Sequence, residues 1–220
     1  MEPHLQHAAA RSEAFGYVCR ACSRCCQHKV IQVNPYEVAR LARLKAMTTA
    51  EFRAAYTEDG MGAILKRTED SDTCVFLKEK GCSVHPDRPL VCRLYPLGRV
   101  VSADGTERWR HATPHPQSEG VYSKAGTIGD FIEAQGALPF MRAADAYAQW
   151  VREAGALIAE SGGDPQSEDF PDDLLDMDTA VAEYCAAAGT SEPSDIEERR
   201  ELHMKILYRQ LEQLKGDSDE

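Results

Sequence analysis

The chain has 220 residues, 43% of them hydrophobic, and its formal net charge at pH 7 is -11. This length and apolar fraction suffice for one large domain or a compact domain with an appendage. The negative charge disfavours generic nucleic-acid binding, and no run of about 18 apolar residues exists that would span a membrane. Because the N-terminus also lacks the apolar stretch of a secretory signal, we expect a cytoplasmic protein with neither nucleic-acid nor membrane partners.

The N-terminal part begins with residues 1–16, which we expect to be a flexible lead-in. Four cysteines follow at 19–26, and residues 30–33 alternate in polarity as a short strand would. Helix starts are predicted at Asn34 and at Thr48. At each of these positions a capping residue is followed three positions later by glutamate, which is the pattern of a capping box.

Two hairpins are predicted next. Apolar residues beginning at Cys74 and at Cys82 flank a polar turn, so the hairpin would bring these two cysteines near each other. Residues 99–102 and 106–110 flank an Asp-Gly pair, which is a strong hairpin signal between alternating runs. The middle of the chain is therefore expected to be built from short antiparallel strands.

Helical patterns dominate beyond residue 111, with a loop expected at 161–171. A capping box starting at Ser194 opens the last helix. Its apolar stripe either packs on its own domain, which we favour, or docks an unknown protein partner. The stripe consists of Met204, Leu207, Leu211 and Leu214. The expected helices cover about 127–135, 138–161, 173–188 and 195–215.

The predicted fold class is α+β. A small metal-nucleated unit with short hairpins, residues 17–112, follows the lead-in of residues 1–16. Residues 113–220 form a helical, acidic region that we expect to pack on the first as one domain. The charge is uneven, because residues 1–100 carry 15 Lys and Arg against 11 Asp and Glu, whereas residues 101–220 carry 10 against 25.

Cysteine spacing is the most informative feature of the chain, because seven of the eight cysteines lie within the first 92 residues. The first four read C-x2-C-x2-C-C, and such short gaps let thiolates converge on one metal ion or cluster. An intracellular chain keeps thiols reduced, which favours metal binding over disulfides. The candidate metal and cofactor ligands are Cys19, Cys22, Cys25, Cys26, Cys74, Cys82 and Cys92.

Seven thiolates exceed one tetrahedral site, so several arrangements stay open. Two zinc ions would need eight ligands, or seven with one bridging. Alternatively, four cysteines bind a [4Fe-4S] cluster, and the first three spacings match the bacterial ferredoxin pattern whereas the fourth does not. Adjacent side chains diverge in most backbone conformations, so Cys25 and Cys26 are not expected to bind one mononuclear ion together.

Other candidates stand near the cysteines. His85 and His28 are alternative nitrogen ligands, although a loop or hydrogen-bonding role is the simpler interpretation of each. Cys185, far along the chain, reads as a buried small hydrophobe. Basic residues beside the motif would offset thiolate charge. They are Arg20, Arg24, Lys29, Arg88 and Arg93.

These residues resemble the YkgJ-like CxxCxxCC cysteine-cluster family, whose domains are described as zinc- or iron-chelating. The likeness covers residues 17–100 and includes the stretch from Cys82 through Arg88-Pro89 to Cys92-Arg93-Leu94-Tyr95-Pro96. It implies that the seven cysteines belong to one metal-binding unit. The family often has glycine where this chain has Ser23, and a left-handed backbone there would be costly for serine.

Three functions are compatible with these residues. The first is a cytoplasmic iron–sulfur protein. Its favoured cofactor is a [4Fe-4S] cluster, and its expected role is in redox chemistry. The second is a structural zinc protein whose acidic helical half binds a partner. The third is metal handling with exchangeable metal. Neither a catalytic residue nor a reaction follows from the sequence, since no nucleotide loop or hydrolase motif is present.

Overall fold

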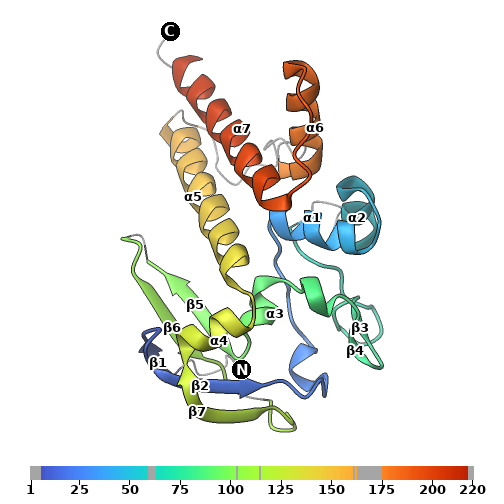
Figure 1. Ribbon diagram of the computed structural model, residues 1–220, viewed down its shortest axis with the longest axis vertical. Coiled ribbons are helices and arrows are strands. Elements are labelled where there is room, and N and C mark those ends of the chain that lie inside the picture. Colours follow the sequence, from blue (N-terminus) through green and yellow to red (C-terminus); the bar gives the residue numbers. More distant parts are fainter. Residues whose placement is uncertain are drawn as a thin grey trace. The chain divides into compact units, whose positions relative to one another are not determined.

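The computed structural model describes residues 6–58, 63–102, 104–113, 115–160, 162 and 175–217. Its packing divides the chain into two compact units, each assembled from two stretches of sequence. We call them the cysteine unit (Met1–Gln32 with Ile64–Leu138) and the helical unit (Val33–Ala63 with Pro139–Glu220). Short antiparallel strands and predominantly C-terminal helices confirm the α+β class (Figure 1). These units alternate along the chain, so their bounds differ from the ranges 17–112 and 113–220 named from the sequence.

The cysteine unit contains the strands. One sheet has the order β1-β6-β5, while β2 pairs with β7 and β3 pairs with β4, all antiparallel. Both expected hairpins, β3–β4 and β5–β6, are confirmed. The strands are β1 (Gln6–Ala9), β2 (Ala14–Val18), β3 (Leu77–Lys78), β4 (Gly81–Cys82), β5 (Leu97–Val101), β6 (Glu107–His111) and β7 (Val121–Thr127).

Two local expectations differ from the structure. Where a lead-in without structure was expected, the chain forms β1 and β2, because distant strands supply their partners: Tyr17 lies opposite Tyr122 in β7. Residues 30–33 do not form a strand and make only an isolated bridge from Gln32 to Ile64. A segment became a strand where a distant strand paired with it, whereas alternating polarity over four residues was not sufficient to form one.

Aromatic side chains fill the core of the cysteine unit. Trp109 of β6 is fully buried. Phe15 of β2 meets Phe131 edge to face, with ring centroids 5.1 Å apart. Phe131 belongs to α4 (Ile128–Ala134), which begins with a capping box between Thr127 and Asp130. The ring contact packs α4 against β2, the strand that leads into the cysteine motif, and the capping box fixes where the helix begins.

The helical unit begins with two helices whose starts follow the sequence prediction. Asn34 and Glu37 form one capping box, and Thr48 and Glu51 form the other. The loop expected at 161–171 lies outside the described residues, apart from Gly162. The helices of this unit are α1 (Pro35–Leu44), α2 (Thr49–Tyr56), α5 (Leu138–Glu160), α6 (Met177–Ala188) and α7 (Ile196–Asp217).

Helices α6 and α7 pack against each other (Figure 1). Cys185 is 3% exposed and packs with Val181 and Ile206, which confirms it as a buried hydrophobe. Three residues of the α7 stripe, Met204, Leu207 and Leu211, are buried, whereas Leu214 is 53% exposed. Most of the stripe is therefore used inside the helical unit. None of the helices in the described ranges is long and apolar enough to cross a lipid bilayer.

Candidate metal centre

The first cysteine segment is a tightly turned loop after β2. It contains a 3-10 turn, η1 (Arg24–Cys26), closed by a hydrogen bond from the Cys26 amide to the Ser23 carbonyl at 3.2 Å. Three non-glycine residues, Ala21, Ser23 and His28, have φ between 53° and 63°. Left-handed backbone costs an L-residue about 1–2 kcal/mol. Ser23 thus adopts the left-handed conformation that would be costly for serine.

The second segment is the β3–β4 hairpin. Its turn is anchored by hydrogen bonds from the Leu77 amide to the Cys74 carbonyl at 2.8 Å and from the Ser83 amide to the Phe76 carbonyl at 2.9 Å. Cys82 lies opposite Leu77 in the ladder. Cys74 lies before β3 and makes an isolated bridge with Arg67, and both Cys74 and Cys82 line the cavity described below.

The third segment carries Cys92 on α3 (Leu90–Leu94), preceded by the 3-10 turn η3 (His85–Asp87). The buried Arg93 holds it in place. Its guanidinium donates one hydrogen bond to the Pro86 carbonyl and another to the Gln135 carbonyl, the latter at 2.9 Å. Arg93 therefore ties the loop before Cys92 to the end of α4, which is a structural role.

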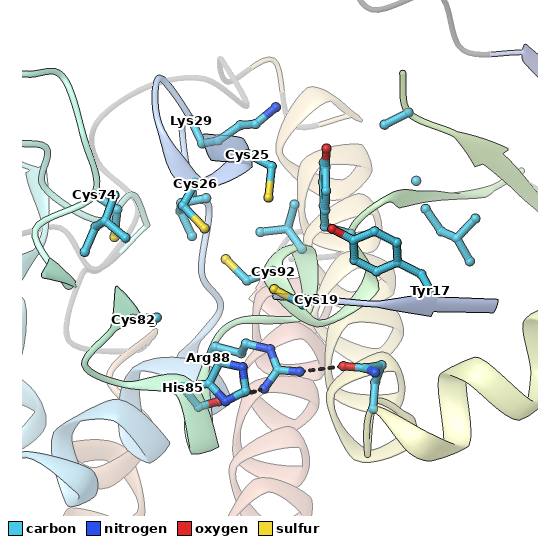
Figure 2. Close-up of a pocket in the computed structure, with 18 of the residues that line it drawn as sticks. Tyr17, Cys19, Cys25, Cys26, Lys29, Cys74, Cys82, His85, Arg88 and Cys92 are labelled. Carbon is cyan, nitrogen blue, oxygen red and sulfur yellow. Dashed lines mark hydrogen bonds between the residues drawn. The ribbon is translucent and has the colours of Figure 1, made fainter. Parts of the chain in front are cut away.

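Six of the seven N-terminal cysteines line one cavity of about 300 Å³ in the cysteine unit. Cys22 is not among the lining residues, and its sulfur accepts a hydrogen bond from the Glu119 amide at 3.5 Å. Figure 2 shows the sulfur atoms of Cys19, Cys25 and Cys92 near the middle of the cavity. None of the eight cysteines, which all lie in the described ranges, forms a disulfide. The lining cysteines are Cys19, Cys25, Cys26, Cys74, Cys82 and Cys92.

Cys25 and Cys26 both face this cavity, although adjacent side chains were expected to diverge. The expectation holds for extended backbone, whereas these two residues lie on a 3-10 turn. A hydrogen bond from the Cys26 thiol lowers the pKa of Cys25 to about 6, against the opposing effect of burial. The same bond, together with burial, raises the pKa of Cys26. Cys25 is therefore the thiolate of the pair.

Among the described residues that line the cavity, Lys29 and Arg88 carry positive charge, and none is Asp or Glu. Burial lowers the pKa of Arg88, and the thiolates of Cys92, Cys82 and Cys19 act in the opposite direction. A guanidinium stays protonated in proteins, so Arg88 is a fixed positive charge beside the thiols.

Aromatic rings that the sequence analysis did not single out close one side of the cavity. Tyr17 and Tyr95 meet edge to face with centroids 6.1 Å apart, and the Lys29 ammonium lies 5.8 Å from the centre of the Tyr95 ring. Burial, followed by other effects that include the Cys25 and Cys19 thiolates, raises the pKa of Tyr17 to about 12. Both phenols are therefore neutral at physiological pH. Tyr95 belongs to the sequence motif that begins at Cys92, so the motif could have identified it as a residue of the site.

The two candidate histidines differ in position. His85 lines the cavity, and burial followed by the charges of Arg88 and Arg93 lowers its pKa. His28 is not among the lining residues, and its Nδ1 lies 3.4 Å from a carboxylate oxygen of Asp72. Of the two, only His85 shares the cavity with the thiols.

The donor chemistry of the cavity suits zinc or iron, which take thiolate and imidazole ligands in proteins. Within the described ranges, no three His, Cys, Asp or Glu side chains are grouped as they would be around a single metal ion. The thiols thus share one cavity without forming a closed coordination shell. Metal binding would have to draw them closer together.

Comparison with known proteins supplies a family for this segment. Residues 18–113 match the family model CxxCxxCC, described as a "Putative zinc- or iron-chelating domain". The match covers somewhat under half of the 220 residues and includes all seven N-terminal cysteines. Neither the curated proteins nor the solved structures contain a match to the chain. The cysteine-rich segment, residues 18–113, is therefore similar to the CxxCxxCC family, whose domain is described as zinc- or iron-chelating.

Proposed function

We propose that the chain is a cytoplasmic iron–sulfur protein whose cavity thiols hold a [4Fe-4S] cluster used for electron transfer. The observation that supports this most is the presence of six thiols around one cavity of about 300 Å³. A mononuclear zinc site and a cubane cluster each bind up to four thiolates, but the cubane presents several metal atoms over a larger volume, which suits a cavity that six thiols line.

The surroundings of the thiols support the same proposal. Ile31, Leu97 and Phe131 contribute apolar lining. Burial, charge and hydrogen bonds to the sulfurs are the features by which proteins set the reduction potential of a cluster. Lys29 and Arg88 supply two positive charges, which equal the net negative charge of an oxidised [4Fe-4S] cluster with four thiolates.

The ligand set is also a proposal. The cluster would be held by four of the six cavity cysteines, with Cys19, Cys25, Cys26 and Cys92 the first set to test. The charges of the other three thiols act on Cys26, which supports testing these four as one group. Cys74 couples instead to Cys82, its hairpin neighbour. Cys22, whose sulfur faces the Glu119 amide, would lie outside the set.

Metal and sulfide analysis of anaerobically purified protein tests the proposal. We expect about four iron atoms and four acid-labile sulfides per chain, with absorption near 400 nm that bleaches on reduction. Stoichiometric zinc without iron, even after anaerobic supply of iron and sulfide, would reject it. That outcome favours the alternative of a structural zinc site, which the family description equally covers.

Cysteine variants test the ligand set. Serine substitution of Cys25 or Cys92 should lower iron and sulfide content, because an alcohol is a poor ligand for iron in such clusters. Cys22→Ser should retain the cluster, and Cys185→Ala serves as the matched control because that thiol lies in the helical core. Cluster loss in Cys22→Ser with retention in Cys92→Ser would overturn the assignment.

A further inference from the structure

Arg88 is a half-buried cation held rigidly in the wall of the cavity. One guanidinium nitrogen donates a hydrogen bond to the Gln135 side-chain oxygen at 2.5 Å. Another donates to the His85 carbonyl at 2.8 Å and lies 3.3 Å from the His85 Nδ1. Both ends of the fork are therefore hydrogen-bonded, which holds the charge at the cavity wall.

The thiols that Arg88 faces come from three separate segments. Its charge acts on Cys19 after β2, on Cys82 in β4 and on Cys92 in α3. Figure 2 shows the Arg88 side chain extending beneath Cys19 and Cys92. The other cation of the wall, Lys29, is exposed. Arg88 is thus a half-buried positive charge that acts on thiols of all three cysteine segments.

Thiolates need such a charge when they bind metal. Four thiolates on a divalent ion or on an oxidised cubane leave a net charge of about -2, which is costly in a cavity of low polarity. A fixed guanidinium offsets this charge without having to be reoriented, whereas an exposed ammonium is screened by water and salt. The anchoring by Gln135 and His85 is therefore what makes Arg88 effective.

We propose that Arg88 is the positioning cation of this site, fixed by Gln135 and His85, and that it raises both the metal affinity of the thiols and the reduction potential of the bound centre. This inference rests on the proposed function, namely that the cavity thiols bind metal. It adds that their affinity and potential are controlled by a residue that is not itself a ligand.

Substitutions that change the charge at Arg88 or beside it test this role. In Arg88→Gln we expect Co²⁺ affinity, read from the sulfur-to-cobalt charge-transfer band of metal-free protein, to fall by about tenfold or more. The midpoint potential of the reconstituted cluster should become more negative. Arg88→Lys should recover part of both losses. Gln135→Glu keeps the oxygen that accepts from Arg88 and adds a negative charge that offsets the guanidinium, so it should resemble Arg88→Gln.

Two controls separate charge from structure. Gln135→Ala removes the anchor without adding charge and should change both quantities less than Gln135→Glu does. Lys29→Gln removes the exposed cation and should also have a smaller effect than Arg88→Gln.

Two outcomes would overturn the role of Arg88 and leave metal binding intact. One is that Arg88→Gln and Gln135→Glu match the wild type in affinity and potential, and the other is that Arg88→Lys is no better than Arg88→Gln. A wild-type protein that binds neither cobalt nor cluster would overturn the proposed function and this inference together.

Discussion

The Cys26 thiol donates a hydrogen bond to the sulfur of Cys25, its neighbour in the chain. The 3-10 turn η1 makes this contact because it directs both side chains into one cavity. The bond polarises the pair into a thiolate and a thiol. The thiolate has the lower pKa, and its reactivity can be measured without metal.

We expect Cys25 to be the most reactive thiol in the metal-free protein. Its thiolate forms as the pH rises through about 6, so iodoacetamide should modify Cys25 with a midpoint near that pH. Peptide mass spectrometry after timed labelling from pH 5 to 9 measures this. Cys26→Ala removes the donor and should shift the midpoint upward, whereas Cys26→Ser, which keeps a hydroxyl donor, should shift it less. A midpoint near 8.5, the ordinary value, would contradict the prediction.

Ser23→Gly should stabilise the cysteine unit. Ser23 has φ 63°, a left-handed conformation that glycine adopts freely. Relative to Ser23→Ala, which keeps the unfavourable backbone and loses the hydroxyl, the glycine variant should be more stable by about 1 kcal/mol. Urea unfolding followed by circular dichroism gives the difference in free energy of unfolding. Equal stability of the two variants would show that this backbone conformation is not costly.

Glu107→Gln should destabilise the protein in a pH-dependent way. Burial acts to raise the pKa of Glu107, but hydrogen bonds from Arg11 and Arg99 prevail and lower it to about 2. A pKa below the unfolded value stabilises the fold above about pH 4.5, and this stabilisation is lost as the pH falls through about 2. The variant should therefore lose about 1.5–3 kcal/mol at pH 7.

Parallel urea unfolding of both proteins at several pH values measures this difference. The gap between wild type and Glu107→Gln should narrow as the pH is lowered from about 4.5 toward 2. Arg108→Gln changes one charge on a neighbouring exposed side chain and serves as the control. A gap that stays constant over the whole range would argue against the ion pairs as its cause.

Gly120→Ala should disturb the wall of the cavity. A Cβ at residue 120 would lie 2.6 Å from Cζ of Tyr17, so the ring would have to move. Overpacking of this kind costs about 1–3 kcal/mol. Gly129→Ala is the matched control, since its Cβ would meet nothing closer than 3.5 Å and it lies within α4. Chemical denaturation should show a loss for the first variant and little change for the second. Equal effects would mean that Tyr17 is not held in place.

Helix starts were predictable because their signals are local. The side chains of Asn34 and Thr48 cap the backbone three residues on, which requires no information from elsewhere in the chain. The last helix shows the limit of prediction from such local signals. A capping box was expected from Ser194, but the carboxylate of Asp195 accepts hydrogen bonds from the amides of Glu197 and Glu198. Two adjacent capping residues competed, and the sequence could not rank them.

Strands β2 and β7 could not be predicted from local pattern. Their pairing joins residues about a hundred positions apart, as Tyr17 and Tyr122 show. Six of the seven residues of β7 are exposed, so the strand lacks the alternation that marks a half-buried one. The segment forms a strand because β2 lies beside it and pairs with its backbone.

The candidate site was predictable in its cysteines and not in its surroundings. Spacing identified the thiols, because ligand chemistry restricts which residues and gaps are useful. The orientation of Cys22 away from the cavity depends on the loop geometry, which spacing does not encode. Gln135, the anchor of Arg88, comes from the end of α4 and carries no signal in the sequence.

The cysteine unit is interrupted in sequence, because residues 33–63 stand between Cys26 and Cys74 and belong to the helical unit. A ribosome therefore delivers the four thiols of the first motif well before the hairpin and α3 emerge. During that interval the nascent polypeptide exposes sulfur donors whose partners have not been synthesised. Any machinery that loads the site must consequently wait for Cys92, or shield the early thiols from oxidation until it arrives.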